Sequence, residues 1–200
     1  MKKYRIRKGS IADTTCKAGK VMCVSLAVAG LIFFSGCQTD GAIEPSTEEE
    51  IVEVTMDFKS YDVPIDKELQ LYIYNLCKDY GVDPAIVISL IEIESGYNAA
   101  AIGDGGESYG LMQIQPKWWS ERMAELGATD LLNPYHNVTI GIDILADKLS
   151  EGQGVEWALM AYNGGAQYAN EMTASGQVSD YAITIMAEAY KLTAERSFYE

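Results

Sequence analysis

The chain has 200 residues, of which 48% are apolar and 22% charged, and its net charge is near −14. This composition excludes a disordered acidic tail and a collagen-like chain. The length predicts one folded domain, or two at most.

The charge is distributed unevenly along the chain. Residues 1–36 carry seven of the 15 basic residues and only one of the 29 acidic residues, so the remainder has a net charge near −20. Such a surface repels phosphate backbones, which argues against a nucleic-acid partner.

The amino-terminal segment has the pattern of a targeting sequence. Residues 21–34 are uncharged and almost wholly apolar, but they are too few for a membrane span, which needs about 20 residues. They fit the apolar region of a secretory signal. The run FFSGC that follows resembles a bacterial lipobox and predicts lipid attachment at Cys37, with an uncleaved signal anchor as the alternative. In either case the remainder lies outside the cytoplasm, attached to the membrane and facing the cell wall.

Three regions are therefore expected. Residues 1–36 form the signal, residues 37–60 form the lipidated cysteine and an acidic tether, and residues 61–200 form the folded domain. The tether lets the domain reach away from the membrane. Cys77 is the only cysteine of the domain, and its apolar neighbours at helical spacing predict a small buried side chain.

The domain is predicted to be mainly α-helical. Apolar residues repeat at helical spacing over Ile65–Tyr80 and stop at Gly81. Asp83 and Pro84 then begin a helix over Pro84–Glu94 that is apolar on most faces and therefore buried. A glycine-rich loop with at most a short ribbon follows at 96–110, and Asn133-Pro134 marks a turn. Further helices are expected at 116–126, 136–151, 154–163, 166–175 and 178–196.

Glu94 is the first candidate for chemistry. Its carboxyl group ends a buried apolar helix and precedes the glycine-rich loop, so partial desolvation should raise its pKa. A carboxyl that keeps its proton near neutral pH is what a general acid needs. From its position alone, Glu94 could equally be an exposed carboxylate at the end of a helix.

Three further patterns join Glu94. The run GLMQI at 110–114 offers a permissive glycine and the two-way hydrogen bonding of Gln113. The run AYNGG at 161–165 ends an apolar helix with an aromatic hydroxyl and an amide. Tyr181 lies in the last long helix. Each pattern also has a purely structural interpretation. GLMQI could be part of the core, AYNGG could be a helix cap, and Tyr181 could be a buried aromatic residue.

Taken in order, these motifs resemble the catalytic domain of soluble-type lytic transglycosylases, a family related to goose-type lysozyme. The match comprises Glu94-Ser95, GLMQI with Pro116, AYNGG and Tyr181, with Asn137 and Gly141 at family-like positions. It covers about residues 65–195. The resemblance implies a lysozyme-like helical fold with a glycine-rich loop at the active site.

The resemblance also implies an activity. Family members cut the β-1,4 bond between N-acetylmuramic acid and N-acetylglucosamine of peptidoglycan and leave 1,6-anhydro ends. Glu94 would serve as general acid and then as base, without a second carboxylate. The residues implied to bind substrate are Ser95, Met112, Gln113, Tyr162, Asn163 and Tyr181. Trp118 and Trp119 could stack on sugars, although packing into the domain is the expectation for both.

The loop between Glu94 and GLMQI departs from the family. A serine that often bonds the substrate acetamide would fall near Gly103 or Asp104, and Ser108 lies closer to GLMQI than expected. Asp104 and Glu107 are expected to be solvated loop acids. If one of them holds a water molecule, the enzyme becomes a hydrolytic muramidase. A wall-binding module without turnover is a third alternative, from a different class.

No cofactor is expected. His136 is the only histidine and has no Cys or His at ligand spacing, which argues against a zinc site. No Walker or GxGxxG loop is present. The expected partners are peptidoglycan glycan strands and the membrane. A secretion or cell-wall machine is left open as a further partner.

Overall fold

The computed structural model describes residues 58–197, with side chains through residue 194. The chain divides into two units, Met1–Val52 and Glu53–Glu200, and every described residue belongs to the second. The expected signal, the lipid site at Cys37 and most of the acidic tether lie outside the described residues. Within residues 58–197, no helix combines the length and apolarity needed to cross a membrane.

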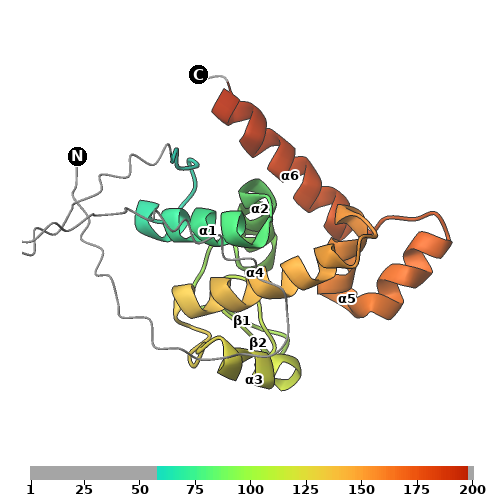
Figure 1. Ribbon diagram of the computed structural model, residues 1–200, viewed down its shortest axis with the longest axis horizontal. Helices are drawn as coiled ribbons and strands as arrows, with labels where there is room; N and C mark the ends of the chain where they lie inside the picture. Colours follow the sequence, from blue (N-terminus) through green and yellow to red (C-terminus); the bar gives the residue numbers. More distant parts are fainter. Residues whose placement is uncertain (1–57, 198–200) are drawn as a thin grey trace, which may run out of the picture. The chain divides into compact units, whose positions relative to one another are not determined.

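The described unit is built from six helices and one very short ribbon (Figure 1). The ribbon pairs two antiparallel strands in the glycine-rich loop, with Ile102 opposite Tyr109 and Gly103 opposite Ser108. The prediction of a mainly α-helical domain is confirmed. The elements are α1 (Lys67–Tyr80), α2 (Pro84–Ser95), β1 (Ile102–Gly103), β2 (Ser108–Tyr109), α3 (Pro116–Glu125), α4 (Pro134–Ser150), α5 (Val155–Ala174) and α6 (Asp180–Ser197).

The helix ends follow local capping chemistry. Asp66 accepts a hydrogen bond from the backbone N–H of Leu69, so α1 begins two residues later than the apolar pattern indicates. Asp83 caps α2 as predicted. Asn133 caps α4 by accepting from two backbone N–H groups. That helix therefore begins at Pro134, two residues earlier than expected, because Asn-Pro here is a cap with proline at the first helical position.

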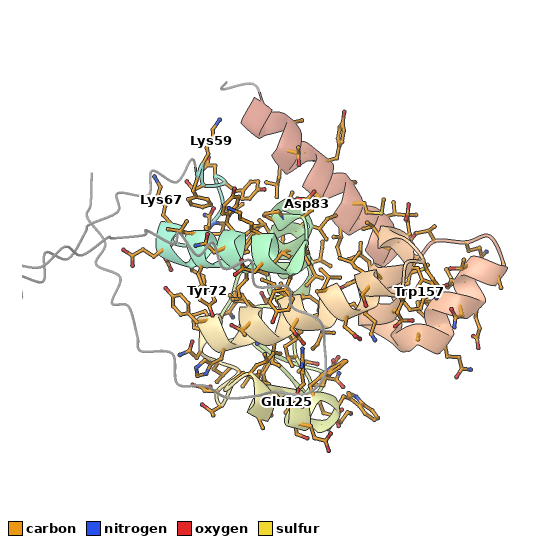
Figure 2. The ribbon with its side chains drawn as sticks, in the orientation of Figure 1. Lys59, Lys67, Tyr72, Asp83, Glu125 and Trp157 are labelled. Atoms are coloured by element: carbon orange, nitrogen blue, oxygen red, sulfur yellow. The ribbon has the colours of Figure 1, made fainter. Side chains whose placement is uncertain are left out.

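Helix α5 is bent in the middle, as the Gly-Gly stop in the sequence indicates. Gly165 has φ 82° and ψ 163°, which no residue with a side chain adopts easily, and it separates two helical arms (Figure 1). Trp157 of the first arm is buried (Figure 2). Its Nε1 donates to Asn170 Oδ1 of the second arm at 2.9 Å. This bond joins the two arms across the bend. Asn163 lies just before the bend.

The core forms around α2 and α4. Helix α2 packs against α6 and α1, while α4 packs against α1 and α5. The central side chains of α2 are almost fully buried, so α2 is the buried helix that its composition predicts. Cys77 of α1 is also fully buried, as expected, and burial raises the pKa of its thiol to about 12. This thiol is therefore a packing group and not a nucleophile.

Asn137 of α4 holds the GLMQI loop against the core. Its side chain is completely buried and accepts from the backbone N–H of Met112 at 2.7 Å. The same amide donates to the carbonyl oxygens of Tyr109 and Leu131, at 2.7 and 2.9 Å. A Cβ atom at Gly110 would lie 2.3 Å from the Asn137 amide nitrogen, so only glycine lets the loop approach this closely.

We predict that Asn137→Ala destabilises the domain by about 3 kcal/mol or more, because it leaves an N–H and two carbonyl groups buried without partners. Urea unfolding measures this. Asn98→Ala is the matched control, since Asn98 is exposed and caps a single backbone N–H. Its expected cost is below about 1 kcal/mol. Equal losses in the two variants would contradict this role of Asn137.

Candidate active site

Glu94 lies in the last turn of α2, with its carboxyl group half-buried. Burial is the largest influence on this carboxyl and raises its pKa. The Tyr181 hydroxyl donates to Glu94 Oε1 at 2.5 Å and lowers the pKa by a smaller amount, while the negative charge of Asp104 raises it. The net shift is upward, so Glu94 holds its proton to higher pH than an exposed glutamate.

Two tyrosines flank Glu94 and remain protonated. Tyr181 lies in the first turn of α6, and the α2–α6 packing brings its hydroxyl to Glu94. Tyr162 lies in the first arm of α5, and its hydroxyl donates to the Met112 carbonyl at 2.9 Å. Burial and the nearby Glu94 charge raise the pKa of both phenols. Both therefore act as hydrogen-bond donors at physiological pH.

The GLMQI segment lies beside Tyr162, which bonds to the Met112 carbonyl. The Met112 side chain is fully buried, and it packs so tightly on α4 that a Cβ atom at Gly141 would lie 2.3 Å from its Sδ. Gln113 has φ 48°, an uncommon conformation for a residue with a side chain. The Gln113 Nε2 donates to the Gly110 carbonyl at 2.9 Å, so its amide supports the loop it belongs to.

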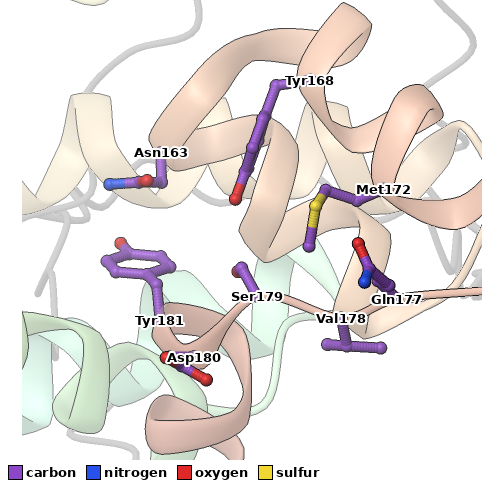
Figure 3. Close-up of a pocket in the computed structure, with 8 residues that line it drawn as sticks. All are labelled: Asn163, Tyr168, Met172, Gln177, Val178, Ser179, Asp180 and Tyr181. Atoms are coloured by element: carbon purple, nitrogen blue, oxygen red, sulfur yellow. The ribbon is translucent and has the colours of Figure 1, made fainter. Parts of the chain in front are cut away.

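A cavity of about 530 Å³ opens beside Tyr181 (Figure 3). Figure 3 shows Asn163 of α5 facing the Tyr181 hydroxyl across this space. Among the described residues no side-chain hydrogen bond engages the exposed Asn163 amide, so it is available to a ligand. The other lining residues are Tyr168, Met172, Gln177, Val178, Ser179 and Asp180.

The structure thus brings together most of the residues implied by the motifs. Glu94 meets Tyr181, Tyr162 meets Met112, and Asn163 faces Tyr181 across the cavity. Ser95 adjoins Glu94 in sequence, but its hydroxyl donates to the Ile91 carbonyl of its own helix at 3.0 Å. The order of the motifs predicted this set of residues. The hydrogen bonds among them could be identified only from the tertiary structure.

The glycine-rich loop carries a polar cluster that the motifs did not predict. Asp104 Oδ2 accepts from Ser108 at 2.5 Å and from Gln115 Nε2 at 2.9 Å. Glu107 forms an ion pair with Lys117. Both acids are exposed, as expected, and in addition each carboxylate has a protein partner. The only sequence signal was a set of polar residues around the glycines of one short ribbon.

The two neighbouring tryptophans differ in burial. Trp119 is partly buried against the core, as expected. Trp118 is 71% exposed, so the expectation that it packs into the domain is wrong. Helix α3 contains no buried residue, and Trp118 in its first turn is exposed to solvent.

No metal site is found in the part of the chain that the structure describes. No group of three or more His, Cys, Asp or Glu side chains gathers there in positions to hold an ion. His136 Nδ1 instead accepts from the backbone N–H of Asp130 at 3.3 Å.

A helical domain with one partly buried glutamate beside a cavity is a lysozyme-like architecture. Residues 72–184 match the family model of the transglycosylase SLT domain, and the chain belongs to this family. The fold resembles that of an inactive mutant of the lytic transglycosylase Slt from Pseudomonas aeruginosa. This likeness has a TM-score of 0.56 at 18% identity, over 64% of this chain and 24% of that one.

Three relatives are similar in sequence. A transglycosylase of Enterobacteria phage PRD1 is 33% identical over 91 residues, which is 46% of this chain and 32% of that protein. Membrane-bound lytic murein transglycosylase C of Actinobacillus pleuropneumoniae is 31% identical, over 46% of this chain and 29% of that protein. Endo-type membrane-bound lytic murein transglycosylase A of Klebsiella pneumoniae is 35% identical, over 34% of this chain and 36% of that protein. The chain therefore spans about a third of the length of the relatives it matches.

We predict that carbon-13 NMR titration of the Glu94 carboxyl gives a pKa above the ordinary glutamate value. Tyr181→Phe raises this pKa further, because the lost hydrogen bond favoured the charged form. Asp104→Asn lowers it, because a neighbouring negative charge is removed. Glu107→Gln is the control, since that loop carboxylate is already paired with Lys117. Shifts in the same direction for the Tyr181 and Asp104 variants would contradict these assignments.

Proposed function

We propose that this protein is a peptidoglycan lytic transglycosylase, and that it cleaves the β-1,4 bond between N-acetylmuramic acid and N-acetylglucosamine. The observation that carries the proposal is Glu94, a half-buried carboxyl with a raised pKa, hydrogen-bonded to Tyr181 at the edge of the cavity. Membership of the transglycosylase SLT domain family and the transglycosylase names of the relatives support the same chemistry.

The proposed reaction uses Glu94 twice. The protonated carboxyl gives its proton to the glycosidic oxygen, so the bond to C1 breaks and the leaving sugar gains a hydroxyl. The resulting carboxylate then takes the proton of the muramyl C6 hydroxyl, whose oxygen attacks C1 and closes a 1,6-anhydro ring. Because the attacking group belongs to the substrate, it has a high effective concentration and no water need be activated.

The surrounding residues have supporting roles in this proposal. Tyr181 donates to the Glu94 carboxylate and stabilises it after the first proton transfer. Asn163 faces the same space with an unengaged amide that suits the substrate acetamide. Tyr162, Met112 and Gln113 bond within the protein, and so they shape the wall of the site.

The pH dependence follows from the raised pKa of Glu94. The first step needs the protonated acid, so kcat/KM is expected to fall as pH rises through that pKa. Activity therefore extends to higher pH than an ordinary glutamate would allow. This is the practical consequence of placing the carboxyl at the end of a buried helix.

We predict that Glu94→Gln lowers peptidoglycan cleavage by about 10²- to 10⁴-fold, because the amide can neither donate an acidic proton nor accept one. The assay is mass spectrometry of soluble fragments released from purified peptidoglycan. A released fragment lighter by one water than its hydrolysed counterpart identifies the 1,6-anhydro end. Glu92→Gln is the control, since this exposed glutamate of the same helix bonds only to Tyr97. Undiminished cleavage by Glu94→Gln would refute the assignment.

A hydrolytic muramidase is the second candidate, and Asp104 favours it. This carboxylate lies close enough to raise the pKa of Glu94 and is held in place by Ser108 and Gln115. A held carboxylate near the acid could orient a water molecule toward C1. The same mass spectra separate the two reactions. Reducing ends that disappear in Asp104→Asn would assign hydrolysis to this residue.

We also propose that the domain works outside the cytoplasm, held to the membrane through Cys37. The apolar run at 21–34, the lipobox-like FFSGC and the membrane-bound description of two relatives support this. A diacylated cysteine supplies two or more chains, and such a pair anchors stably. The acidic residues that follow would then act as a spacer.

We predict that Cys37→Ser abolishes the lipid-modified N-terminal peptide in mass spectra and leaves the apolar run at 21–34 uncleaved, so that the variant stays with the membrane as a longer precursor. Cys23→Ser is the control, since it changes a cysteine inside the apolar run and leaves the lipobox-like motif intact. A parent protein that retains residues 1–36 and carries no lipid adduct would favour an uncleaved signal anchor.

A further inference from the structure

Trp118 is an exposed tryptophan without a packing role. It lies in the first turn of α3 with 71% of its surface exposed, whereas Trp157 is 1% exposed and Trp119 packs partly against the core. Tryptophan is normally highly buried, because its ring contributes more apolar area than most other side chains. An indole left in water at this site is therefore a feature to be explained.

The Trp118 ring is held in one orientation. Its Nε1 donates to Gln115 Oε1 at 3.1 Å. The Lys117 ammonium lies 5.4 Å from the ring centroid and also forms the ion pair with Glu107. These contacts fix the indole before any ligand arrives, which lowers the entropy lost on binding.

The same contacts connect Trp118 to the active site. Gln115, which accepts from the indole, donates through Nε2 to Asp104 and to Ser108 of the glycine-rich loop. Asp104 in turn is close enough to Glu94 for its charge to act on that carboxyl. The preceding residue, Gly103, approaches Gln113 closely, since a Cβ atom there would lie 2.3 Å from the Gln113 side-chain oxygen. Trp118 is thus connected through Gln115 to the same loop whose Asp104 acts on Glu94.

We propose that the Trp118 ring is a stacking platform for an N-acetylglucosamine unit of the glycan strand, at a subsite away from the bond that Glu94 cleaves. One face of this sugar carries C–H groups, which pack well against the electron-rich face of an indole. The inference rests on the proposed function, since it extends the same glycan beyond the cavity. It assigns to Trp118 a binding role that the motifs around Glu94 do not include.

The local charges favour an uncharged sugar. Asp104 and Glu107 lie on the loop beside α3, and the chain after residue 36 has a net charge near −20. An anionic ligand would be repelled by such a surface, whereas a neutral acetamido sugar would not. Binding through dispersion and apolar contact therefore suits this protein better than binding through charge.

The test measures binding apart from catalysis. In the Glu94→Gln background, isothermal titration calorimetry with linear N-acetylglucosamine oligomers follows affinity as the chain lengthens from two to six units. The expected result is that affinity rises with length until the oligomer reaches Trp118. Trp118→Ala should remove that rise, with a loss of about five- to tenfold for the hexamer and none for the dimer.

Two further variants separate stacking from structure. Trp118→Phe keeps a flat ring and should restore most of the lost affinity, although it cannot donate to Gln115. Tyr190→Ala removes an aromatic ring that is 77% exposed on α6, and it should leave the hexamer affinity unchanged. Thermal unfolding of each variant should show that the domain remains folded, because α3 contains no buried residue and Tyr190 is exposed.

Kinetics on the active protein complete the test. Trp118→Ala should raise KM for long glycan strands by about five- to tenfold and leave kcat within about twofold, because the ring is remote from the reacting atoms. Equal affinity of Trp118→Ala and the parent for the hexamer, or an equal loss at every oligomer length, would overturn the platform. Full cleavage by Glu94→Gln would overturn the proposed function instead, and the oligomer titrations would still decide the role of Trp118.

Discussion

Burial of helix α2 is the constraint on which the active site depends. The helix is apolar on most faces and packs against α1 and α6, so its last turn has a fixed position within the domain. Glu94 occupies that turn. The same burial removes water from its carboxyl group, which disfavours the charged form and raises its pKa. Position and protonation state therefore have a single physical cause.

Polar contacts inside the apolar core complete the site. Asn137 bonds three backbone groups around the GLMQI loop, and Tyr162 bonds the Met112 carbonyl from the opposite side. Each bond satisfies a backbone group that would otherwise be buried without a partner. The loop can therefore run close to α4, where Gly110 and Gly141 leave no room for a Cβ atom. These few contacts hold the GLMQI loop in place beside α4.

The acidity of the domain fits a neutral ligand better than a charged one. Carboxylates surround the glycine-rich loop, and two of them are held by Ser108, Gln115 and Lys117. A field of this sign gives no attraction to anionic wall polymers. In the proposed function, a membrane tether would supply the local concentration that charge does not. Shape and hydrogen bonding at the cavity would then select the glycan.

Much of the fold could be predicted from local patterns. Asp83-Pro84 and Gly81 mark helix ends because capping depends on neighbouring residues, and Gly165 divides α5 because its conformation excludes a side chain. The order of Glu94, GLMQI, AYNGG and Tyr181 also predicted which residues form the candidate site. Burial of Cys77 followed from helical spacing alone.

The relations between distant residues were decided only by the tertiary structure. Tyr181 lies 87 residues from Glu94, and their hydrogen bond exists because α6 packs on α2. Trp118 and Trp119 are adjacent in the chain, yet one is exposed and the other packs against the core, since the direction of α3 sets their burial. Sequence by itself determined where the helices lie, several of their caps and the order of the motifs, because these depend on neighbouring residues. The hydrogen-bond partners of the site residues, their burial and the pKa of Glu94 depend on how the helices pack. Local periodicity in the sequence does not encode that packing.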